Sequence, residues 1–600
     1  MANDSGRRVR GFSAEAGKDE DWFKAEAGKR KKRRGKKGPA LFILILIFLI
    51  AGIVCGIYLY KKYSPGKTRA DLNEYYKVQG TEAAVIVNRE LTDIKALYDD
   101  GVYLDYETVK NDYNDKFYFD RYEKLLLFTT PDKLITIAPD QTAYTVNKSD
   151  QDFGSVIFKI SGDTAYINID FVKQYASFSY EVFKDPARVC ITTPDKASIK
   201  TAEVKRKAAI RWRAGIKSDI LEDVSRGDNV VILDEHVDDN GFIKVMGPEA
   251  TIGYMKEKRL RDYKDESVSV DKYTPEEYTH ISHDGKIVLG WHQVITSAGN
   301  ASLSSTLDSS KGINVISPTW MQVKGDKGDV TDLASDEYIS TAHGRGLEVW
   351  PLIDDFAPDF KIGDVLKKTS VRQKLEKNIM AEAIKYSFDG INIDFENVQA
   401  ENGDDFVQFV REMGIMCRNN GIILSIDNYP PTDSSEYYNR AAQAEAADYV
   451  VTMAYDEHYA NDDEAGPTAD MPFIKDSVDN TLNEVPKEQA IIGLPFYCRL
   501  WTESSKEGDT SIKSEAYSMK TAPSVLANAG VNAKWDDKLK MNWGSYTDND
   551  GNKYSIWIED LKSMKEKLAY VKDADTAGMA FWKLGLEVPE VWPEIRKANQ

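Results

Sequence analysis

The segment FDGINIDFEN, residues 388–397, alternates apolar and polar side chains. Successive side chains of a strand point to opposite faces, so Asn392, Asp394 and Glu396 are expected to share one face. Crowding of two carboxyl groups raises the pKa of one of them, which then holds a proton near neutral pH and can act as a general acid. The pattern therefore predicts acid–base chemistry, with an internal ion-pair network as the structural alternative.

This segment is one of eight buried-type strand runs that follow residue 285, most of them separated by helix-like segments. The runs cover residues 286–294, 313–323, 346–356, 388–398, 421–431, 447–459, 489–501 and 576–587. Such strand–helix units predict an α/β fold, a (β/α)8 TIM barrel over residues 286–600, better than an open sheet. A small α+β insertion is expected at about residues 502–575. Chemistry in these barrels lies at the carboxyl ends of the strands.

The polar segment resembles the D-G-x-D-x-D-x-E signature of glycoside hydrolase family 18. Asp389, Gly390, Asp394 and Glu396 match it, whereas Asn392 replaces the first Asp of the inner triplet. Further segments resemble the family in the same order: Met-Ala-Tyr-Asp at 453–456, Gly-Leu-Pro-Phe-Tyr at 493–497, and Trp582. Within the family, the sequence is most similar to the spore-germination-type, cortex-lytic N-acetylglucosaminidases, over roughly residues 285–590.

The resemblance implies a retaining glycosidase that cleaves N-acetylglucosamine-containing polymer, with the substrate's N-acetyl group as nucleophile. Peptidoglycan is the preferred polymer, and chitin stays open as the alternative. Glu396 would protonate the glycosidic oxygen, Asp394 would orient the acetamide, and Tyr455 would hold the acetamide oxygen. The implied substrate-binding residues are Asn392, Asp456, Met453, Tyr497 and Trp582. No cofactor is implied, and the scattered His and Cys residues predict no metal site. A sporulation role would follow only from the subgroup.

The departure at Asn392 leaves two classes of function open. An amide is neutral but can still hydrogen-bond Asp394, so activity with an altered pH profile is expected. The alternative is a catalytically silent cell-wall-binding or scaffolding protein that uses the barrel as a glycan-binding surface. Other tryptophans are candidates for sugar platforms, although a lone Trp more often belongs to a core: Trp291, Trp320, Trp350, Trp501, Trp535, Trp543 and Trp557.

The charge of the chain divides at one apolar run. Residues 1–67 hold 16 Lys and Arg against 6 Asp and Glu, a net +10, and the remaining residues carry −29, which gives −19 in total. Such an acidic chain is not expected to bind nucleic acid. Residues 41–60 lack any charge and are long enough, at about 1.5 Å per residue, for one transmembrane helix.

The basic tail, residues 1–40, is expected to remain in the cytoplasm, with the catalytic domain outside the cell membrane. A cleaved signal peptide is the alternative for this run. We prefer a retained anchor, because the run is longer than a signal peptide's apolar region and no A-x-A site follows it.

Two modules are predicted between the apolar run and the barrel. Residues 129–133 recur as 192–196, and residues 102–109 align with 165–172 at the same offset, which predicts a duplicated α+β extracytoplasmic module over 70–198. It resembles the copper amine oxidase N-terminal-like domain, without a His cluster to bind copper.

Residues 203–260 alternate short strands with turns, which predicts a small β-barrel module. They resemble a bacterial Src-homology-3-like domain, for which a groove that binds wall peptides and a plain spacer both stay open. Residues 261–285 are polar and are expected to form a linker.

Overall fold

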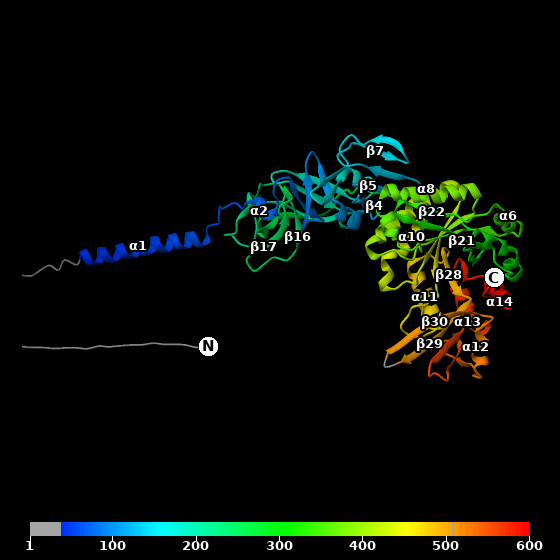
Figure 1. Cartoon of the computed structure of the whole chain (residues 1–600). Coiled ribbons are helices and arrows are strands. Elements are labelled where there is room, and N and C mark those ends of the chain that lie inside the picture. The colour runs from blue at the N-terminus through cyan, green and yellow to red at the C-terminus, as the bar shows by residue number, and fades with distance from the viewer. Residues whose placement is uncertain (1–37, 507–508) are drawn as a thin grey trace, which may run out of the picture.

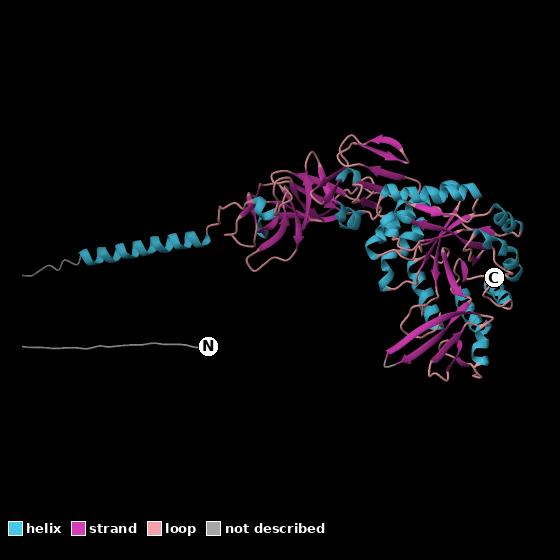
Figure 2. Cartoon of the chain, viewed as in Figure 1, coloured by secondary structure: helices cyan, strands magenta, loops and turns pink. Residues whose placement is uncertain are grey.

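The computed structural model describes residues 38–506 and 509–600 of the 600-residue chain. The parts follow one another along one direction: helix α1, two strand-rich modules, and an α/β barrel with a small sheet beside it (Figure 1). Figure 2 shows that the helices are concentrated in α1 and in the barrel. The predicted basic tail lies, up to residue 37, outside the described residues.

Helix α1 (Gly38–Tyr63) carries the apolar run. Its segment Ala40–Tyr63 is long and apolar enough to cross a membrane, and none of it is buried against the rest of the chain. At about 1.5 Å per residue its 24 residues extend ~36 Å, somewhat more than the ~30 Å of a hydrocarbon layer. Within the described residues it is the one helix with these properties.

The module of residues 70–198 contains two sheets, with the strand orders β11-β12-β1-β2-β3-β10-β9 and β4-β5-β6-β7-β8. The strands are β1 Glu82–Val87, β2 Glu90–Tyr98, β3 Val102–Asp105, β4 Phe117–Asp120, β5 Leu125–Thr129, β6 Leu134–Ile137, β7 Ala143–Val146, β8 Ser149–Asp152, β9 Phe158–Ser161, β10 Thr164–Asn168, β11 Ser179–Phe183 and β12 Arg188–Thr192. The short helices are α2 Leu72–Tyr76, α3 Tyr106–Thr108 and α4 Ile169–Val172.

The two repeated segments lie side by side in this module. Strands β3 and β10 pair antiparallel, and each runs directly into a short helix, α3 or α4. A polar side chain caps each helix, Asp105 in the first and Asn168 in the second. Phe117, Phe128 and Phe171 pack between the sheets and join them in one core.

Residues 198–267 form a seven-stranded sheet in the order β15-β14-β18-β17-β16-β13-β19. The strands are β13 Ser198–Val204, β14 Ala208–Arg211, β15 Ile220–Val224, β16 Asn229–Asp234, β17 Phe242–Met246, β18 Ile252–Lys256 and β19 Leu260–Ser267. The sheet is longer than the predicted 203–260, because β13 and β19 pair along most of their length. Residues 261–267, predicted as linker, are therefore strand.

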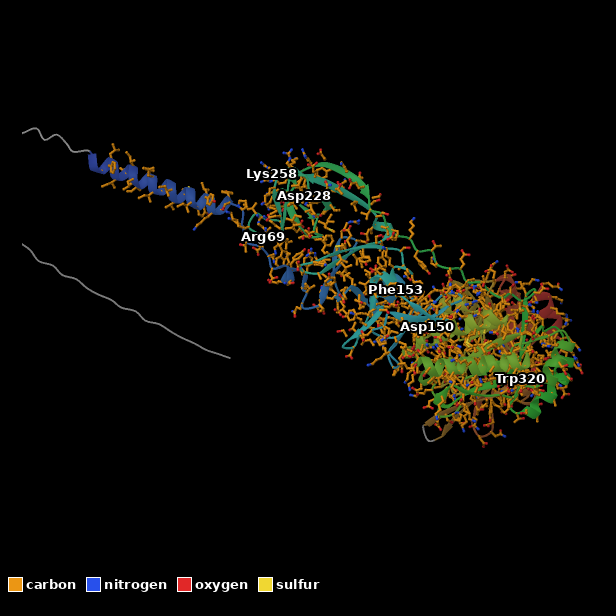
Figure 3. The ribbon with its side chains drawn as sticks, turned by 90° about the horizontal axis from the view of Figure 1, so that it is seen from above. Arg69, Asp150, Phe153, Asp228, Lys258 and Trp320 are labelled. Atoms are coloured by element: carbon orange, nitrogen blue, oxygen red, sulfur yellow. The ribbon has the colours of Figure 1, made fainter. Side chains whose placement is uncertain are left out.

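This second module lies beside helix α1, although the other module separates it from α1 in the sequence (Figures 1 and 3). The amide of Gly66 donates to the carbonyl of Ile216 at 2.7 Å, and Arg69 forms an ion pair with Asp223. Figure 3 shows Arg69 at this end of the molecule and Trp320 in the barrel at the other. The order of the modules in space thus differs from their order in the chain.

Residues 268–285 return from this end to the barrel without forming a helix or strand in the described structure. The amide of Tyr273 donates to Ser177 Oγ at 2.9 Å, in the first module. The amide of Ile281 donates to Asp448 Oδ1 at 2.6 Å, in the barrel. The linker is therefore held to both parts that it passes.

Eight parallel strands close into the predicted barrel, in the order β20-β34-β28-β27-β26-β25-β24-β21, with β20 also paired to β21. The strands are β20 Ile287–His292, β21 Val315–Lys324, β24 Leu352–Asp354, β25 Gly390–Asp394, β26 Ile423–Asn428, β27 Tyr449–Met453, β28 Ala490–Pro495 and β34 Gly578–Trp582; the short strands β22 Asp329–Thr331 and β23 Glu348–Val349 pair with β21. Each barrel strand falls on one of the eight predicted runs.

Helices cover the outside of the barrel (Figure 2). They are α5 Leu303–Ser309, α6 Asp336–Gly344, α7 Ile362–Leu366, α8 Thr369–Tyr386, α9 Gly403–Asn420, α10 Arg440–Ala446, α11 Met471–Glu484, α13 Leu561–Asp573 and α14 Val591–Ala598. The apolar side chains that alternate with the inward ones on the strands pack against these helices in one continuous core.

A five-stranded sheet, in the order β30-β29-β33-β32-β31, stands beside the barrel. Its elements are β29 Tyr497–Lys506, β30 Asp509–Ser518, β31 Lys534–Asp536, β32 Met541–Thr547, β33 Lys553–Ile558 and helix α12 Ala522–Asn528. The insertion therefore covers residues 497–558 and not about 502–575. The predicted run 489–501 is divided between β28 and β29, and α13 is a helix of the barrel itself.

The first module packs against barrel helices α8 and α9 through buried polar groups. Arg372 is fully buried there, with its guanidinium 2.8 Å from Glu412 Oε1 and 4.9 Å from the ring centre of Tyr118 on β4. Asp120, at the end of β4, accepts a hydrogen bond from the amide of Thr369 at 2.7 Å. These contacts fix the barrel relative to the module.

We expect Arg372→Ala to lower the free energy of unfolding by about 3–5 kcal/mol, because it leaves Glu412 and the nearby Glu376 buried without a cation. Urea unfolding followed by tryptophan fluorescence measures the change. Arg345→Ala is the matched control, since its ion pair with Asp308 is exposed and worth about 0–1 kcal/mol. An equally small loss in both variants would contradict the assignment.

Candidate active site

Strand β25 carries the polar segment to the carboxyl end of the barrel. It begins at Gly390, where a Cβ would lie 2.6 Å from the indole of Trp350, so that no larger residue fits without displacing the ring. Asp389 precedes it at the other end of the strand, and its Oδ2 accepts from the amide of Val349 at 2.8 Å. The first Asp of the signature therefore has a structural place, away from the barrel mouth.

The three inward polar side chains of this segment differ in depth. Asn392 and Asp394 lie in the barrel interior, 0% and 5% exposed, and Glu396 is half-buried just beyond the strand. The intervening apolar side chains pack toward the helices, as the alternation predicts. The deep pair and the shallower acid thus form a column that rises toward the mouth.

Burial and neighbouring carboxylates raise the pKa of both acids in this column. Burial is the largest cause for Glu396, whose pKa rises to about 7, and the charges of Asp355 and Asp456 add to it. The pKa of Asp394 lies well above its usual range because of burial first and then the charges of Glu396 and Asp427. Glu396 is therefore suited to give up a proton near neutral pH.

The peptide around Glu396 is held from two sides. Asp355, directly after β24, accepts from the amide of Glu396 at 3.1 Å and from the following amide at 2.9 Å. Tyr438 donates its hydroxyl to the carbonyl of Phe395 at 3.0 Å, and Tyr429 donates to that of Glu396 at 3.3 Å. One carboxylate and two phenols thus fix the backbone that carries the acid.

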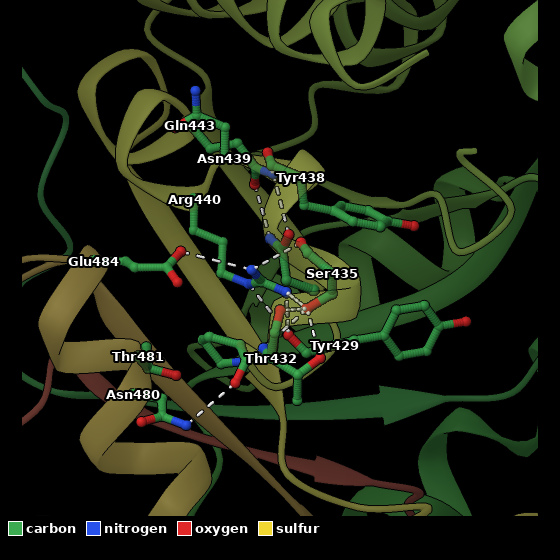
Figure 4. Close-up of polar contacts among 12 residues, drawn as sticks. Tyr429, Thr432, Ser435, Tyr438, Asn439, Arg440, Gln443, Asn480, Thr481 and Glu484 are labelled. Carbon is green, nitrogen blue, oxygen red and sulfur yellow. Dashed lines mark hydrogen bonds and ion pairs between the residues drawn. The ribbon is translucent and has the colours of Figure 1, made fainter. Parts of the chain in front are cut away.

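Both phenols belong to the loop between β26 and α10, which one buried arginine braces. Arg440 donates to the carbonyl of Tyr429 at 2.9 Å and to Ser435 Oγ at 2.8 Å, and it lies 3.6 Å from Glu484 on α11. Figure 4 shows its guanidinium between Glu484 and the loop. The position of Tyr429 and Tyr438 therefore depends on a cation outside the barrel interior.

The other predicted site residues come from the neighbouring strands. Met453 ends β27, and Tyr455 and Asp456 follow it. Asp456 Oδ1 accepts from the hydroxyl of Tyr497 at 2.5 Å and lies 3.6 Å from Arg499, both on β29. The structure thus brings these residues to the same end of the barrel as Asp394 and Glu396.

Trp291, on β20, lies beneath the site. Its Nε1 donates to Asn392 Oδ1 at 2.9 Å, and its ring centre is 6.3 Å from that of Tyr455 and 5.9 Å from that of Trp582. Trp291 is fully buried and therefore does not serve as a platform, whereas Trp582, at the end of β34, is half-buried. Of the other candidate platforms, Trp320, Trp350 and Trp501 are also buried in the core. Half-buried positions in the insertion are held by Trp535, Trp543 and Trp557.

Asn392 forms hydrogen bonds other than the one expected. Its amide bonds Asp427 and Ser425 on the next strand, and within the described residues it has no hydrogen bond to Asp394. Asp427 and Asp355 are not among the site residues predicted from the sequence. Both stand at the carboxyl end of a predicted strand, Asp427 in the segment 425–427 and Asp355 in the segment 353–355. In a barrel of this kind, that position alone marks them as candidate site residues.

Comparison with known proteins shows which family the barrel resembles. Residues 312–587 match the sequence profile of Glycosyl hydrolases family 18. These residues form a family 18 domain. The family predicted from the motifs is thereby confirmed for the barrel. The modules before it lie outside the match, and their predicted families stay predictions.

Two curated relatives come from Bacillus subtilis (strain 168). The chain is 26% identical to the Cortical fragment-lytic enzyme over 236 residues, 38% of this chain and 54% of the relative. It is 27% identical to the Putative sporulation-specific glycosylase YdhD over 232 residues, again 38% and 54%. The chain thus spans about half the length of the curated relatives it matches. A solved structure, the C-terminal domain of a putative chitinase from Desulfitobacterium hafniense DCB-2, has a TM-score of 0.48, 22% identity, and coverage of 53% of this chain and 100% of that chain.

We expect Asp355→Asn to lower the pKa of Glu396, because it removes a negative charge that raises it. Asp355 has a pKa of about 6 and is largely ionised where Glu396 titrates. Labelling by a water-soluble carbodiimide, which attacks protonated carboxyl groups, followed by peptide mass spectrometry across pH, measures the midpoint. Tyr438→Phe is the control, since it removes a hydrogen bond to the same peptide but no charge. An unchanged midpoint in Asp355→Asn would refute this role.

Proposed function

We propose that the barrel hydrolyses a glycan that contains N-acetylglucosamine, peptidoglycan in preference to chitin. The observation that carries the proposal is Glu396, an acid with a pKa of about 7 above the buried Asp394 at the mouth of a family 18 domain. The preference for peptidoglycan rests on the cortex-lytic name of a relative and on the apolar helix that would hold the barrel near a cell wall.

In the proposed first step, the acetamide oxygen of the substrate attacks the anomeric carbon as the glycosidic C–O bond breaks. Glu396 gives its proton to the leaving oxygen. Asp394 accepts a hydrogen bond from the acetamide N–H and faces the positive charge that develops on the acetamide. In the second step water attacks the same carbon, Glu396 takes its proton, and the acetamide is released. Two inversions give net retention.

The other site residues would hold the sugar. The hydroxyl of Tyr455 would bind the acetamide oxygen, and Asp456, fixed by Tyr497, would bind a sugar hydroxyl. Trp582 would stack against the apolar face of the ring. Met453 would line the base of the same subsite, at the end of β27.

We expect Glu396→Gln to lower the rate of sugar release from purified peptidoglycan by about 10²–10⁴-fold, the usual contribution of a positioned general acid. In the wild type, activity should fall as the pH rises through about 7, where Glu396 loses its proton. Mass spectrometry of the products reports the bond that is cut, with chitin oligomers as the second substrate. Glu401→Gln, an exposed glutamate on the following turn, is the matched control. Equal rates for both variants would exclude Glu396 as the acid.

The alternative is a wall-binding protein whose barrel has no turnover. It is favoured by the amide at Asn392, where the family signature has a carboxylate. Binding of glycan oligomers by the wild type, without cleavage of peptidoglycan or chitin, would decide for this alternative.

The proposed location is the outer side of the cell membrane, with α1 as a single span and the basic tail in the cytoplasm. The length and exposure of α1 and the net +10 of residues 1–67 support this orientation. The two strand-rich modules would hold the barrel away from the membrane, since both lie between α1 and the barrel in Figure 1. A wall-peptide site in the second module rests on its resemblance alone.

We expect the full chain to stay in the membrane fraction after an alkaline wash, with its barrel open to protease added outside intact cells. Replacing Leu46 and Leu49 by Arg should release or mislocalise it, because each charge at the centre of a span costs about 2.5–3.5 kcal/mol. Leu91→Arg, on the surface of the first module, is the control. A barrel protected from external protease would reverse the proposed orientation.

A further inference from the structure

The side chain of Asn392 uses all of its hydrogen-bonding capacity at the barrel axis. Its Oδ1 accepts from Trp291 Nε1 at 2.9 Å and from Ser317 Oγ at 3.2 Å. Its Nδ2 donates to Ser425 Oγ at 3.1 Å and to Asp427 Oδ1 at 2.6 Å. An indole N–H can only donate, so the oxygen of the amide must face Trp291 and the nitrogen must face Asp427.

Asn392 is therefore fixed as a donor to Asp427. It has no proton to exchange at neutral pH, and both of its N–H groups are already committed to β26. A side chain that exchanges a proton with Asp394 in this barrel must therefore be one other than Asn392.

Asp427 is the carboxyl group placed to respond. Strands β25 and β26 are in register, with Asn392 beside Ser425, so that Asp394 and Asp427 stand one inward position further along their two strands. Asp427 is 2% exposed. Asp394 Oδ1 and Asp427 Oδ2 are both buried without a hydrogen-bond partner in the described structure.

The groups that face this pair are acids or phenols. Glu396 lies above Asp394 on the same strand, Asp355 faces it from the end of β24, and Tyr455 faces it from the end of β27. Neither Asp394 nor Asp427 has an ion pair with a Lys, Arg or His among the described residues. Two buried carboxyl groups without a cation cannot both be ionised at low cost, so they titrate as a coupled pair.

We propose that Asp427 is a positioning residue that shares one proton with Asp394 and holds that proton while Asp394 faces the substrate as a carboxylate. The amide at position 392 anchors Asp427 and cannot perform this task itself. The inference rests on the proposed function, because it gives Asp427 a part in the same reaction.

Only O–H bonds change in the step assigned to this pair. Before substrate binds, the proton lies on either carboxyl group. As the acetamide nitrogen becomes positive, the O–H bond on Asp394 breaks and the proton passes to Asp427, which leaves Asp394 anionic. When water opens the intermediate and the positive charge is lost, the proton can return. No proton is exchanged with solvent through this pair.

The test compares the full chain with Asp427→Asn and with the double variant Asn392→Asp/Asp427→Asn. The single variant keeps the side-chain volume but removes the group that carries the proton, so kcat should fall about tenfold or more. The acid limb of the pH profile should move to lower pH, because Asp394 loses a like-charged neighbour and its pKa falls. The double variant exchanges donor and acceptor at the 2.6 Å contact and returns a carboxyl group beside Asp394. It should recover most of the rate and the original acid limb.

A structural role for Asp427 predicts a different outcome. The single variant would then lower the melting temperature without moving the acid limb, and the exchange would recover stability but not the pH profile. Either an unmoved acid limb in Asp427→Asn or a double variant no faster than the single one overturns the proposal.

A second readout is independent of turnover. Infrared difference spectra of the full chain at neutral pH, wild type minus Asp427→Asn, should show the carbonyl band of a protonated carboxyl group. A wild type inactive on every glycan would end the proposed function, while this band would still report the shared proton. No such band would end the inference even in an active enzyme.

Discussion

Burial of carboxyl groups without a neighbouring cation is the constraint on which the mouth of this barrel depends. Two fully or nearly buried acids elsewhere in the chain have a cation beside them: Glu412 has Arg372, and Glu559 has Lys567. At the mouth, by contrast, Asp394 and Asp427 are accompanied by an amide, hydroxyl groups and further acids. Protonation, in place of ion pairing, lowers the cost of burial. The same arrangement produces a negative potential at the site where a positively charged intermediate would form in the proposed reaction, and burial of these groups keeps that potential strong.

A cation outside the barrel interior also stabilises the mouth. Arg440 holds the loop from which Tyr429 and Tyr438 reach the peptide of Glu396, and it touches none of the acids at the axis among the described contacts. Positive charge can therefore stabilise the scaffold without lowering the pKa of Glu396. Because Arg440 lies away from the carboxyl group of Glu396, the backbone of Glu396 can be held by hydrogen bonds while the pKa of its side chain stays raised. The backbone around Glu396 is fixed, while its carboxyl group stays free to titrate.

The sequence predicted the barrel and its polar column because alternation along a strand fixes which side chains point inward. For residues 388–398, the inward-facing side chains could be predicted without knowing which strands pair with this one. The partners of Asn392 could not be obtained in this way, since they depend on the register between β25 and β26 and on closure of the barrel across to Trp291. The start of the insertion was misplaced for a related reason. Residues 490–498 form one run without a charged side chain, and only the strand pairing shows that the chain leaves the barrel after β28 and starts a second sheet. The position of the second module beside α1 likewise has no signal in the local pattern.

The return of the chain along residues 268–285 has a mechanical consequence. The barrel is joined to the rest of the molecule twice, once by this covalent segment and once by the docking of β4 against α8. A tether of similar length without the docked interface would let the barrel sweep a wide volume. With both connections in place, the barrel mouth keeps a set height and direction relative to the end of α1. The distance of the barrel mouth from α1 is then set by the length of two packed modules and not by the extension of a flexible chain.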